Sequence, residues 1–321
     1  MSKNNLYSIA LHGGAGTLLR AAMTPEKEAA YRAALNDALL AGMAVLETGG
    51  NALEAVVETV AALESCELFN AGKGAVFTRD GHHELDATLM EGSQRKAGAV
   101  CGLRHIEHPI RLCRLIMDSP YVMLNGDGAE AFAAEHGIPK VENSFFSTPF
   151  RYQQLQDARE TGEVTLDHNE KTNKHKFGTV GAVARDRHGN LAAATSTGGM
   201  TNKPYRRIGD SALIGAGTWA DNATCAVSAT GHGEFFIRTS VASRIASRME
   251  YGGADLKTAA EHMVLHELKA IGGEGGIISV DRDGNLCLPF NSEGMYRAWS
   301  EHEGKVHTAI FSDDARAHAD R

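Results

Sequence analysis

Three segments of the chain share one design, in which an apolar strand leads into a turn containing Asp and Gly and then into a second apolar strand. They are residues 75–90 (AVFTRDGHHELDATLM), 181–196 (GAVARDRHGNLAAATS) and 277–291 (IISVDRDGNLCLPFN). Asp/Gly turns between apolar runs predict β-hairpins, and therefore antiparallel pairing. The return strands are apolar at successive positions, which predicts sheets that are covered on both faces or stacked on one another.

Helical patterns surround these hairpins. Thr24-Pro25-Glu26 combines a capping residue with proline at the first helical position, and predicts a helix that ends at Gly49-Gly50. Asn51 caps a second helix with one apolar face. Further helices are expected over residues 234–249 and from about 254 to 271. We therefore expect an α+β fold, a four-layer αββα sandwich of two antiparallel sheets between helical layers, formed by residues 1–321 as a single domain.

Charge and composition exclude several classes of protein. The 32 Lys+Arg against 40 Asp+Glu give a net charge of −8 without a basic block, which argues against nucleic acid as a partner. No apolar run approaches the roughly 20 residues of a membrane helix. The N-terminal YSIAL is too short for a signal-peptide core, so we expect a cytoplasmic protein without a membrane partner. The five cysteines are scattered without CxxC spacing, which predicts reduced thiols.

One long segment breaks the pattern of apolar elements. Residues 153–176 carry only four apolar side chains, and a polar linker is expected over about 153–177. It ends at Gly178-Thr179, where a buried strand begins. The Thr179 hydroxyl is placed to attack the Gly178 carbonyl, and hydrolysis of the resulting ester would leave Thr179 as a new N-terminus with an amine of pKa about 7.7 to 8.0 as its base. The simpler interpretation is that Gly-Thr only opens a strand.

The return strand and the loop after it carry further candidates. Thr197 returns beside the first strand, where a second hydroxyl is expected to hydrogen-bond the nucleophile, although it is equally an ordinary strand threonine. Arg207 and Asp210, three residues apart in a glycine-containing loop, suit the carboxylate and ammonium of a free amino acid. A solvated surface ion pair is the alternative for these two.

Residues 229–234 (ATGHGE) precede a predicted helix. Glycines at a helix entrance suit a developing oxyanion or a bound carboxylate, and a plain loop is the alternative. His232 is either a general base or, more in keeping with its glycine neighbours, an exposed loop residue.

Two other patterns argue for little. His262 and His266 have the spacing of paired zinc ligands, but the segment is not HExxH and no third ligand is evident. HGGAG at residues 12–16 is similar to an oxyanion loop of α/β-hydrolases, but the chain has no GxSxG motif to supply a serine. We expect HGGAG to shape a turn at the end of the YSIAL strand.

These elements, in this order, resemble the plant-type L-asparaginase and isoaspartyl peptidase family of N-terminal nucleophile hydrolases. The motifs that carry the resemblance cover nearly the whole chain: HGGAG, LFNAGKGAVFT, ELDATLM, GTVGAVARD, TSTGGMTNK, IGDS, TGHGE and NSEGMYRAW. The resemblance implies self-cleavage into a 1–178 α subunit and a 179–321 β subunit, with two such units forming a dimer of heterodimers.

The resemblance also implies roles for individual residues. Thr179 would be the nucleophile, Thr197 its hydrogen-bonding partner, and Thr230 with the Gly231 backbone the oxyanion hole. The substrate α-carboxylate and α-amine would be bound by Arg207 and Asp210, helped by the Gly231 and Gly233 backbone, with Asn70 near the site. No cofactor is expected for catalysis.

The stretch LESCELFNAGK resembles a loop whose main-chain carbonyls bind a structural sodium ion. The implied ligands are Leu63, Glu64, Cys66, Phe69, Ala71 and Lys73. This chain departs from the family pattern at Lys73, which brings a cation into that loop, and at His232, which takes a variable position.

A site that binds a free α-carboxylate and a free α-amine selects an aspartyl unit whose side-chain carbonyl alone is open to attack. L-Asparagine and β-linked isoaspartyl dipeptides meet this condition, and an ordinary peptide bond does not. We therefore expect a self-processing threonine hydrolase of isoaspartyl dipeptides and L-asparagine, acting through an aspartyl ester. The alternatives are a glycosylasparaginase-like hydrolase and, outside the enzymes, a non-catalytic amino-acid-binding protein.

Overall fold

The computed structural model describes residues 6–16, 20–160 and 178–314. Its strands are β1 (Ser8–Gly16), β2 (Leu85–Glu91), β3 (Ala97–Leu103), β4 (Met123–Asn125), β5 (Val180–Arg185), β6 (Leu191–Thr197), β7 (Thr218–Ala220), β8 (Cys225–Gly231), β9 (Gly275–Asp281), β10 (Leu286–Cys287), β11 (Gly294–Ser300) and β12 (His307–Phe311). Its α-helices are α1 (Pro25–Glu47), α2 (Ala52–Glu64), α3 (Pro109–Met117), α4 (Gly126–Glu135), α5 (Pro149–Glu160), α6 (Gly233–Thr239), α7 (Val241–Glu250) and α8 (Leu256–Glu261).

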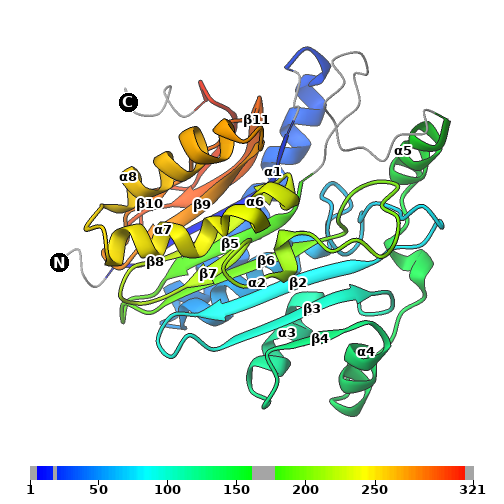
Figure 1. The fold of residues 1–321 in the computed structure, drawn as a ribbon, viewed down its shortest axis with the longest axis horizontal. Coiled ribbons are helices and arrows are strands. Elements are labelled where there is room, and N and C mark those ends of the chain that lie inside the picture. Colours follow the sequence, from blue (N-terminus) through cyan, green and yellow to red (C-terminus); the bar gives the residue numbers. More distant parts are fainter. Residues whose placement is uncertain (1–5, 17–19, 161–177, 315–321) are drawn as a thin grey trace.

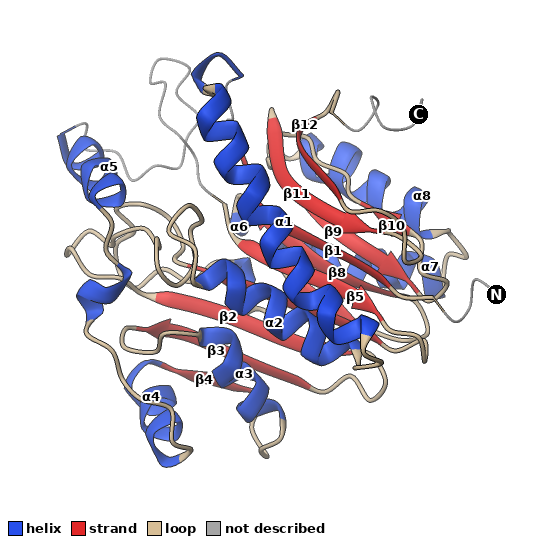
Figure 2. Ribbon diagram, turned by 180° about the vertical axis from the view of Figure 1, so that it is seen from behind, coloured by secondary structure: helices blue, strands red, loops and turns tan. Residues whose placement is uncertain are grey.

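The strands form two sheets stacked face to face. The larger has the order β12-β11-β1-β5-β6-β2-β3-β4 and the smaller β10-β9-β8-β7. Strands β1, β5 and β6 of the large sheet contact β8 and β9 of the small one. Helices α1, α2 and α3 cover the outer face of the large sheet, and α7 and α8 cover that of the small sheet (Figures 1 and 2). The predicted four-layer αββα arrangement is confirmed, with one exception in the pairing: β4 joins β3 in parallel at the edge of the large sheet.

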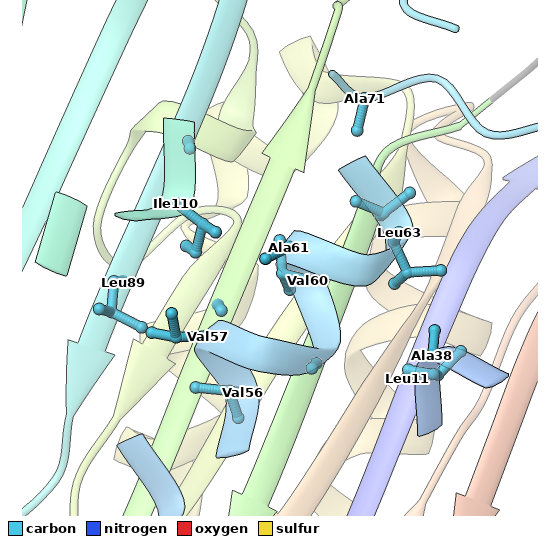
Figure 3. Packing of buried hydrophobic residues seen from close by; sticks show 14 of the residues in the cluster. Leu11, Ala38, Val56, Val57, Val60, Ala61, Leu63, Ala71, Leu89 and Ile110 are labelled. Carbon is cyan, nitrogen blue, oxygen red and sulfur yellow. The ribbon is translucent and has the colours of Figure 1, made fainter. Parts of the chain in front are cut away.

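Three apolar clusters fill the spaces between the layers. The largest lies between the large sheet and its helices, where Val57 of α2 packs near Leu89 of β2 (Figure 3). Another fills the space between the small sheet and α6–α8. The third, between the sheets, is built of small and branched side chains such as Ala10, Val183 and Ile278. Full burial on both faces explains why the strands are apolar at successive positions.

Two of the three predicted hairpins are correct. β5 pairs with β6, and β9 with β10, across the expected turns. The hairpin predicted over residues 75–90 is wrong. The segment before its turn does not pair with β2; it bonds instead to the loop after β6, where Asn202 N donates to Phe77 O and Arg79 N to Lys203 O. Its partner therefore lies more than 120 residues away in sequence.

The predicted helix starts are confirmed by their caps. The Thr24 side chain accepts from Lys27 N, and the Asn51 side chain from Glu54 N. The helix predicted over 234–249 is two helices, because Ser240 adopts a left-handed conformation (φ 49°) between α6 and α7. The helix predicted from 254 continues past α8 as a π-helical segment, η5 (His262–Leu268).

Two further sequence expectations are corrected. HGGAG does not form a turn but is the second half of β1, which bulges between His12 and Gly14 against β11. The polar segment from residue 153 is helical in its first part, because α5 reaches Glu160 with Arg151, Leu155 and Ala158 buried along one side. The remainder of the expected linker, residues 161–177, lies outside the described residues.

The described helices include none long and apolar enough to cross a membrane. All five cysteines are free thiols, as expected.

Candidate active site

Thr179 lies directly before β5, at the end of a central strand of the large sheet. Its side chain is buried, and Oγ1 is 3.1 Å from the Oγ of Ser211. Ser211 belongs to a 3-10 turn, η4 (Asp210–Ala212). On the other side of the residue, the Thr179 carbonyl accepts a hydrogen bond from Nδ1 of His12, at 2.9 Å. Burial lowers the pKa of the His12 imidazole to about 3, against the opposing effect of this hydrogen bond, so His12 is neutral at physiological pH.

Gly178 is wedged between the β1 bulge and the small sheet. A Cβ on Gly178 would lie 2.5 Å from Thr230 Oγ1, 2.6 Å from Ala15 N and 2.6 Å from Gly14 Cα. Real Cβ atoms do not approach other atoms this closely, so only glycine fits without displacement of the backbone. Gly14 itself has φ 116°, a conformation that favours glycine. The structure therefore brings the HGGAG segment, the Gly178-Thr179 junction and Thr230 together.

The Thr230 hydroxyl lies beside this junction in a defined orientation. Its Oγ1 accepts a hydrogen bond from Ala15 N at 3.2 Å. Since the oxygen accepts here, the hydroxyl hydrogen is left to point elsewhere, and it has no acceptor among the described residues. Gly231 ends β8 with φ 144° and pairs with Gly275 of β9. The neighbouring His232 donates its backbone N–H to Glu274 O, and its ring packs against Phe235 with centroids 4.8 Å apart.

Arg207 and Asp210 converge on a single glycine. A Cβ on Gly233 would lie 2.8 Å from Arg207 Nη2 and 2.8 Å from Asp210 Oδ1. Asp210 is 3% exposed, and its Oδ2 has no hydrogen-bond partner in the part of the chain that the structure describes. Burial raises the pKa of Asp210 to about 7, although the Arg207 guanidinium acts to lower it. The alternative of a solvated surface ion pair is thus wrong, because the Asp210 carboxylate is buried.

Sequence reasoning missed the partner of Arg207, which is Glu234. The guanidinium donates from Nε to Oε1 and from Nη2 to Oε2, both at 2.7 Å. Burial would raise the pKa of Glu234, but the hydrogen bonds and charge of Arg207 outweigh it and lower the pKa. This pair fixes the guanidinium plane and leaves Nη1 with no bond among the described residues, available to a carboxylate.

Thr197 and Asn70 both shape the loop after β6. Extending the β5–β6 register by one residue places Thr197 opposite Thr179. In this structure, however, the hydroxyl in contact with Thr179 Oγ1 is that of Ser211, and Thr197 Oγ1 accepts from Gly199 N. Asn70 donates to Gly199 O and accepts from Val76 N, which ties the loop after α2 to the same glycine.

The loop from Leu63 to Lys73 offers backbone carbonyls, which are hard oxygen ligands of the type that alkali cations prefer. Among the six implied ligands, Glu64 O accepts from Lys73 N and Cys66 O from Phe69 N. A Cβ on the following Gly74 would lie 2.8 Å from Phe69 O, an implied ligand, and 2.5 Å from Glu67 O, which is not one of them. The Lys73 ammonium lies 3.5 Å from the exposed Glu67 carboxylate, so its charge is paired there.

The described residues hold no cluster of three or more His, Cys, Asp or Glu side chains suited to a metal ion. His262 bonds to Glu267 at 3.1 Å.

Two further contacts could not be read from the sequence. Ser211 follows Asp210 in the IGDS motif and His12 opens HGGAG, but only the packing of their segments around Thr179 distinguishes them from other polar residues. Glu234 had one usable signal, since it lies in the same run of motifs and a partly buried arginine such as Arg207 favours a nearby counter-charge.

Comparison with known proteins matches residues 5–310 to the family described as Asparaginase. The chain belongs to the asparaginase family. Similar relatives of this asparaginase-family chain include the isoaspartyl peptidase of Salmonella typhimurium, 54% identical over 96% of this chain and 100% of the relative. That of Escherichia coli is 52% identical over 95% of this chain and 96% of the relative. The isoaspartyl peptidase/L-asparaginase of Xenopus laevis is 39% identical over 94% of both chains. The resemblance found from the motifs is confirmed.

Proposed function

We propose that this chain is a self-processing threonine hydrolase that releases L-aspartate from isoaspartyl dipeptides and L-asparagine. The observation that carries the proposal is the position of Thr179: a buried hydroxyl at the head of a central strand, preceded by a glycine that is held against Thr230. The names of the relatives, isoaspartyl peptidase and isoaspartyl peptidase/L-asparaginase, support the same activity.

Maturation begins at Gly178. Oγ1 of Thr179 attacks the Gly178 carbonyl carbon, its proton passes to the departing nitrogen, and the peptide bond is replaced by an ester. Water then hydrolyses the ester and leaves residues 1–178 and 179–321 as separate chains. The new α-amine of Thr179 acts as the base for its own hydroxyl, a role that suits a group whose reference pKa is about 7.7 to 8.0.

Turnover uses the same hydroxyl. Oγ1 attacks the side-chain carbonyl of the substrate, and the Thr230 hydroxyl and Gly231 N–H stabilise the oxyanion. The amine or ammonia leaves with a proton, and water hydrolyses the aspartyl ester to free aspartate. Thr197 lies opposite Thr179 in the sheet, and its hydroxyl and the Asn70 amide both hold the adjoining loop at Gly199.

Substrate selection follows from the charges at Gly233. Arg207 Nη1 binds the α-carboxylate, and the Asp210 oxygen without a described partner accepts from the α-ammonium. A ligand that lacks the ammonium leaves the buried Asp210 oxygen without a partner, and in sites that hydrogen-bond such a group this lowers reactivity by about 10⁴- to 10⁵-fold. An ordinary peptide bond consumes the α-carboxylate, so it forfeits the bond to Arg207 Nη1.

Thr179→Ala and Thr179→Ser test the proposal. The alanine variant lacks the attacking oxygen, so we expect an intact chain on denaturing electrophoresis and no release of aspartate from β-aspartyl-leucine or asparagine. The serine variant keeps a hydroxyl and should cleave and turn over at reduced rates. In the parent, N-terminal sequencing of the smaller piece should read TVGAVARD. Full activity in a permanently intact parent chain would refute the mechanism, and preferential cleavage of a sugar–asparagine would favour the glycosylasparaginase alternative.

We further infer that two cleaved units associate as a dimer of heterodimers, which sedimentation equilibrium checks. Five free thiols support a reducing, cytoplasmic location. A sodium ion with a structural role would be bound by main-chain carbonyls, those of Leu63, Glu64, Cys66, Phe69, Ala71 and Lys73. A melting temperature that is the same in sodium and in choline salts would refute this ion.

A further inference from the structure

A hydrogen-bonded chain of four buried polar side chains crosses the apolar interface between the two sheets and ends at the Thr179 carbonyl. His12 Nε2 lies 3.0 Å from Ser228 Oγ, Ser228 Oγ lies 2.7 Å from Thr195 Oγ1, and Thr218 Oγ1 donates to Thr195 Oγ1 at 2.6 Å. All four side chains are fully buried. They alternate between the sheets: His12 and Thr195 are on β1 and β6, and Ser228 and Thr218 are on β8 and β7. Polar groups in such an interface destabilise the fold unless every one is hydrogen-bonded.

The donor and the acceptor of each hydrogen bond in this chain can be assigned. A carbonyl can only accept, so Nδ1 of His12 must carry the hydrogen that bonds to Thr179 O. The ring is neutral, and Nε2 is therefore an acceptor that takes the hydrogen of Ser228. Ser228 Oγ then accepts from Thr195, which is itself the acceptor for Thr218. A longer contact from Thr195 Oγ1 to Gly217 O, at 3.4 Å, competes only weakly.

A glycine leaves room for the contact between His12 and Ser228. Gly181 pairs with His12 in the β1–β5 ladder and with Thr195 in the β5–β6 ladder. A Cβ at this position would clash with Ser228 Oγ and lie 2.6 Å from His12 Nε2. The β1–β5 ladder ends at the His12–Gly181 pair, and beyond it the imidazole donates to the Thr179 carbonyl.

We propose that His12 is a positioning residue for Thr179, and that the Ser228–Thr195–Thr218 hydroxyls hold His12 in the Nδ1–H tautomer that fixes the Thr179 peptide plane. The inference rests on the proposed function for its effect on rate, but not for the tautomer itself. The Thr179 carbonyl is one bond from the Cα that carries both the hydroxyl and the amine, so tilting this plane misplaces both reacting groups.

The first test reads the tautomer directly. In ¹⁵N-histidine-labelled Thr179→Ala protein, where neither cleavage nor turnover is required, the His12 signal should show a protonated Nδ1 and an unprotonated Nε2. It is assigned by its absence in His12→Asn. Ser228→Ala removes the hydrogen donor to Nε2 and should shift the Nε2 resonance toward that of a nitrogen without a hydrogen bond, while Nδ1 stays protonated because the Thr179 carbonyl can only accept. An Nε2–H tautomer in the protein with Ser228 present would overturn the inference.

The second test measures kinetics in the otherwise unmodified, mature enzyme. We expect Ser228→Ala and His12→Leu to lower kcat by about 10- to 100-fold with KM for asparagine within about twofold, because a small misplacement of reacting atoms has effects of this size. His12→Asn keeps a donor near the Nδ1 position and should recover most of the lost rate. Ser279→Ala is the matched control, since Ser279 is a buried serine of the same small sheet that bonds to Cys287 O.

The outcomes separate the two proposals. If Ser228→Ala lowers kcat no more than Ser279→Ala does, the positioning role is refuted even though Thr179 remains the nucleophile. If Thr179→Ala stays active, the proposed function fails while the tautomer measurement still stands. Should His12→Leu or Ser228→Ala fail to fold, the tautomer of His12 measured with Ser228 present and the rate of His12→Asn decide the question.

Discussion

Asp210 combines deep burial with a charge that the proposed chemistry needs. Its carboxylate is the side chain assigned to the substrate ammonium, yet burial raises its pKa to about 7. A protonated carboxyl cannot pair with an ammonium, so binding requires a pH at or above that value. Between the ordinary pKa of an aspartate and about 7 the folded chain holds a proton that the unfolded chain has lost. The contribution of Asp210 to stability therefore falls as pH rises through that window.

This predicts a pH dependence of ligand binding. L-Aspartate carries the ammonium and succinate lacks it, so the ratio of their affinities should rise about tenfold per pH unit below pH 7 and level off above it. Calorimetric titration of both ligands at several pH values measures the ratio. Asp210→Asn should flatten the ratio; a ratio that is already flat in the parent would contradict the assignment.

Gly178 is the residue where the absence of a side chain matters most for maturation. We expect Gly178→Ala to slow cleavage by roughly 100-fold or more, because its Cβ would meet Thr230 Oγ1, Ala15 N and Gly14 Cα and displace the scissile carbonyl. Electrophoresis over hours after purification follows the intact band. Gly128→Ala, at a position with no atom within 4 Å of the added Cβ, is the control and should cleave at the parent rate.

At the scale of elements, the loop from β6 to η4 and the start of α6 work as one unit, because Arg207 on the first is bound by Glu234 on the second. Glu234 holds the guanidinium plane through two parallel hydrogen bonds, a geometry that a single amide oxygen cannot reproduce.

We therefore expect Glu234→Gln to raise KM for asparagine about tenfold while kcat and the rate of self-cleavage stay within about twofold, the signature of lost binding rather than lost chemistry. Steady-state kinetics on the cleaved protein provide the measurement. Glu267→Gln removes a comparable acceptor of two arginines on the outer helices and should leave KM unchanged. Equal effects of the two substitutions would argue that Arg207 does not bind substrate.

The elements that sequence predicted well are those whose signals are local. Thr24 and Asn51 cap helices a few residues away, and the 181–196 hairpin closes on itself. The elements that were predicted wrongly depend on packing rather than on local sequence signals. Residues 75–79 find their partner near Lys203, and Ser240 breaks a helix whose apolar spacing continues through it. At the site, the motifs single out Thr179, Arg207 and Asp210 as candidates, and their roles are proposals. Ser211, His12 and Ser228 emerge only once it is known which strands face each other across the two sheets.

For the whole molecule, the proposed cut falls in a sheet whose strands are interleaved. In the large sheet β1, β2, β3 and β4 come from residues before 179, and β5, β6, β11 and β12 from residues after it. Three neighbouring pairs, β11–β1, β1–β5 and β6–β2, therefore join the two pieces by backbone hydrogen bonds.

We expect the cleaved protein to remain one particle with both pieces in equal amounts on native mass spectrometry, and to separate only in denaturant. The uncleaved Thr179→Ala chain provides the reference for the native mass. Loss of either piece during gel filtration would show that the sheet does not hold them together.

The place of β5 in that sheet has a consequence for the rate of each catalytic cycle. The first residues of most proteins sample many conformations, and a reacting group attached there must be immobilised afresh for every turnover. Here the new chain end would be the tip of an interior strand with hydrogen-bonded neighbours on either side. The conformational entropy lost in ordering the amine and the hydroxyl is then offset during folding. The free energy of substrate binding is not needed to order these groups in each catalytic cycle.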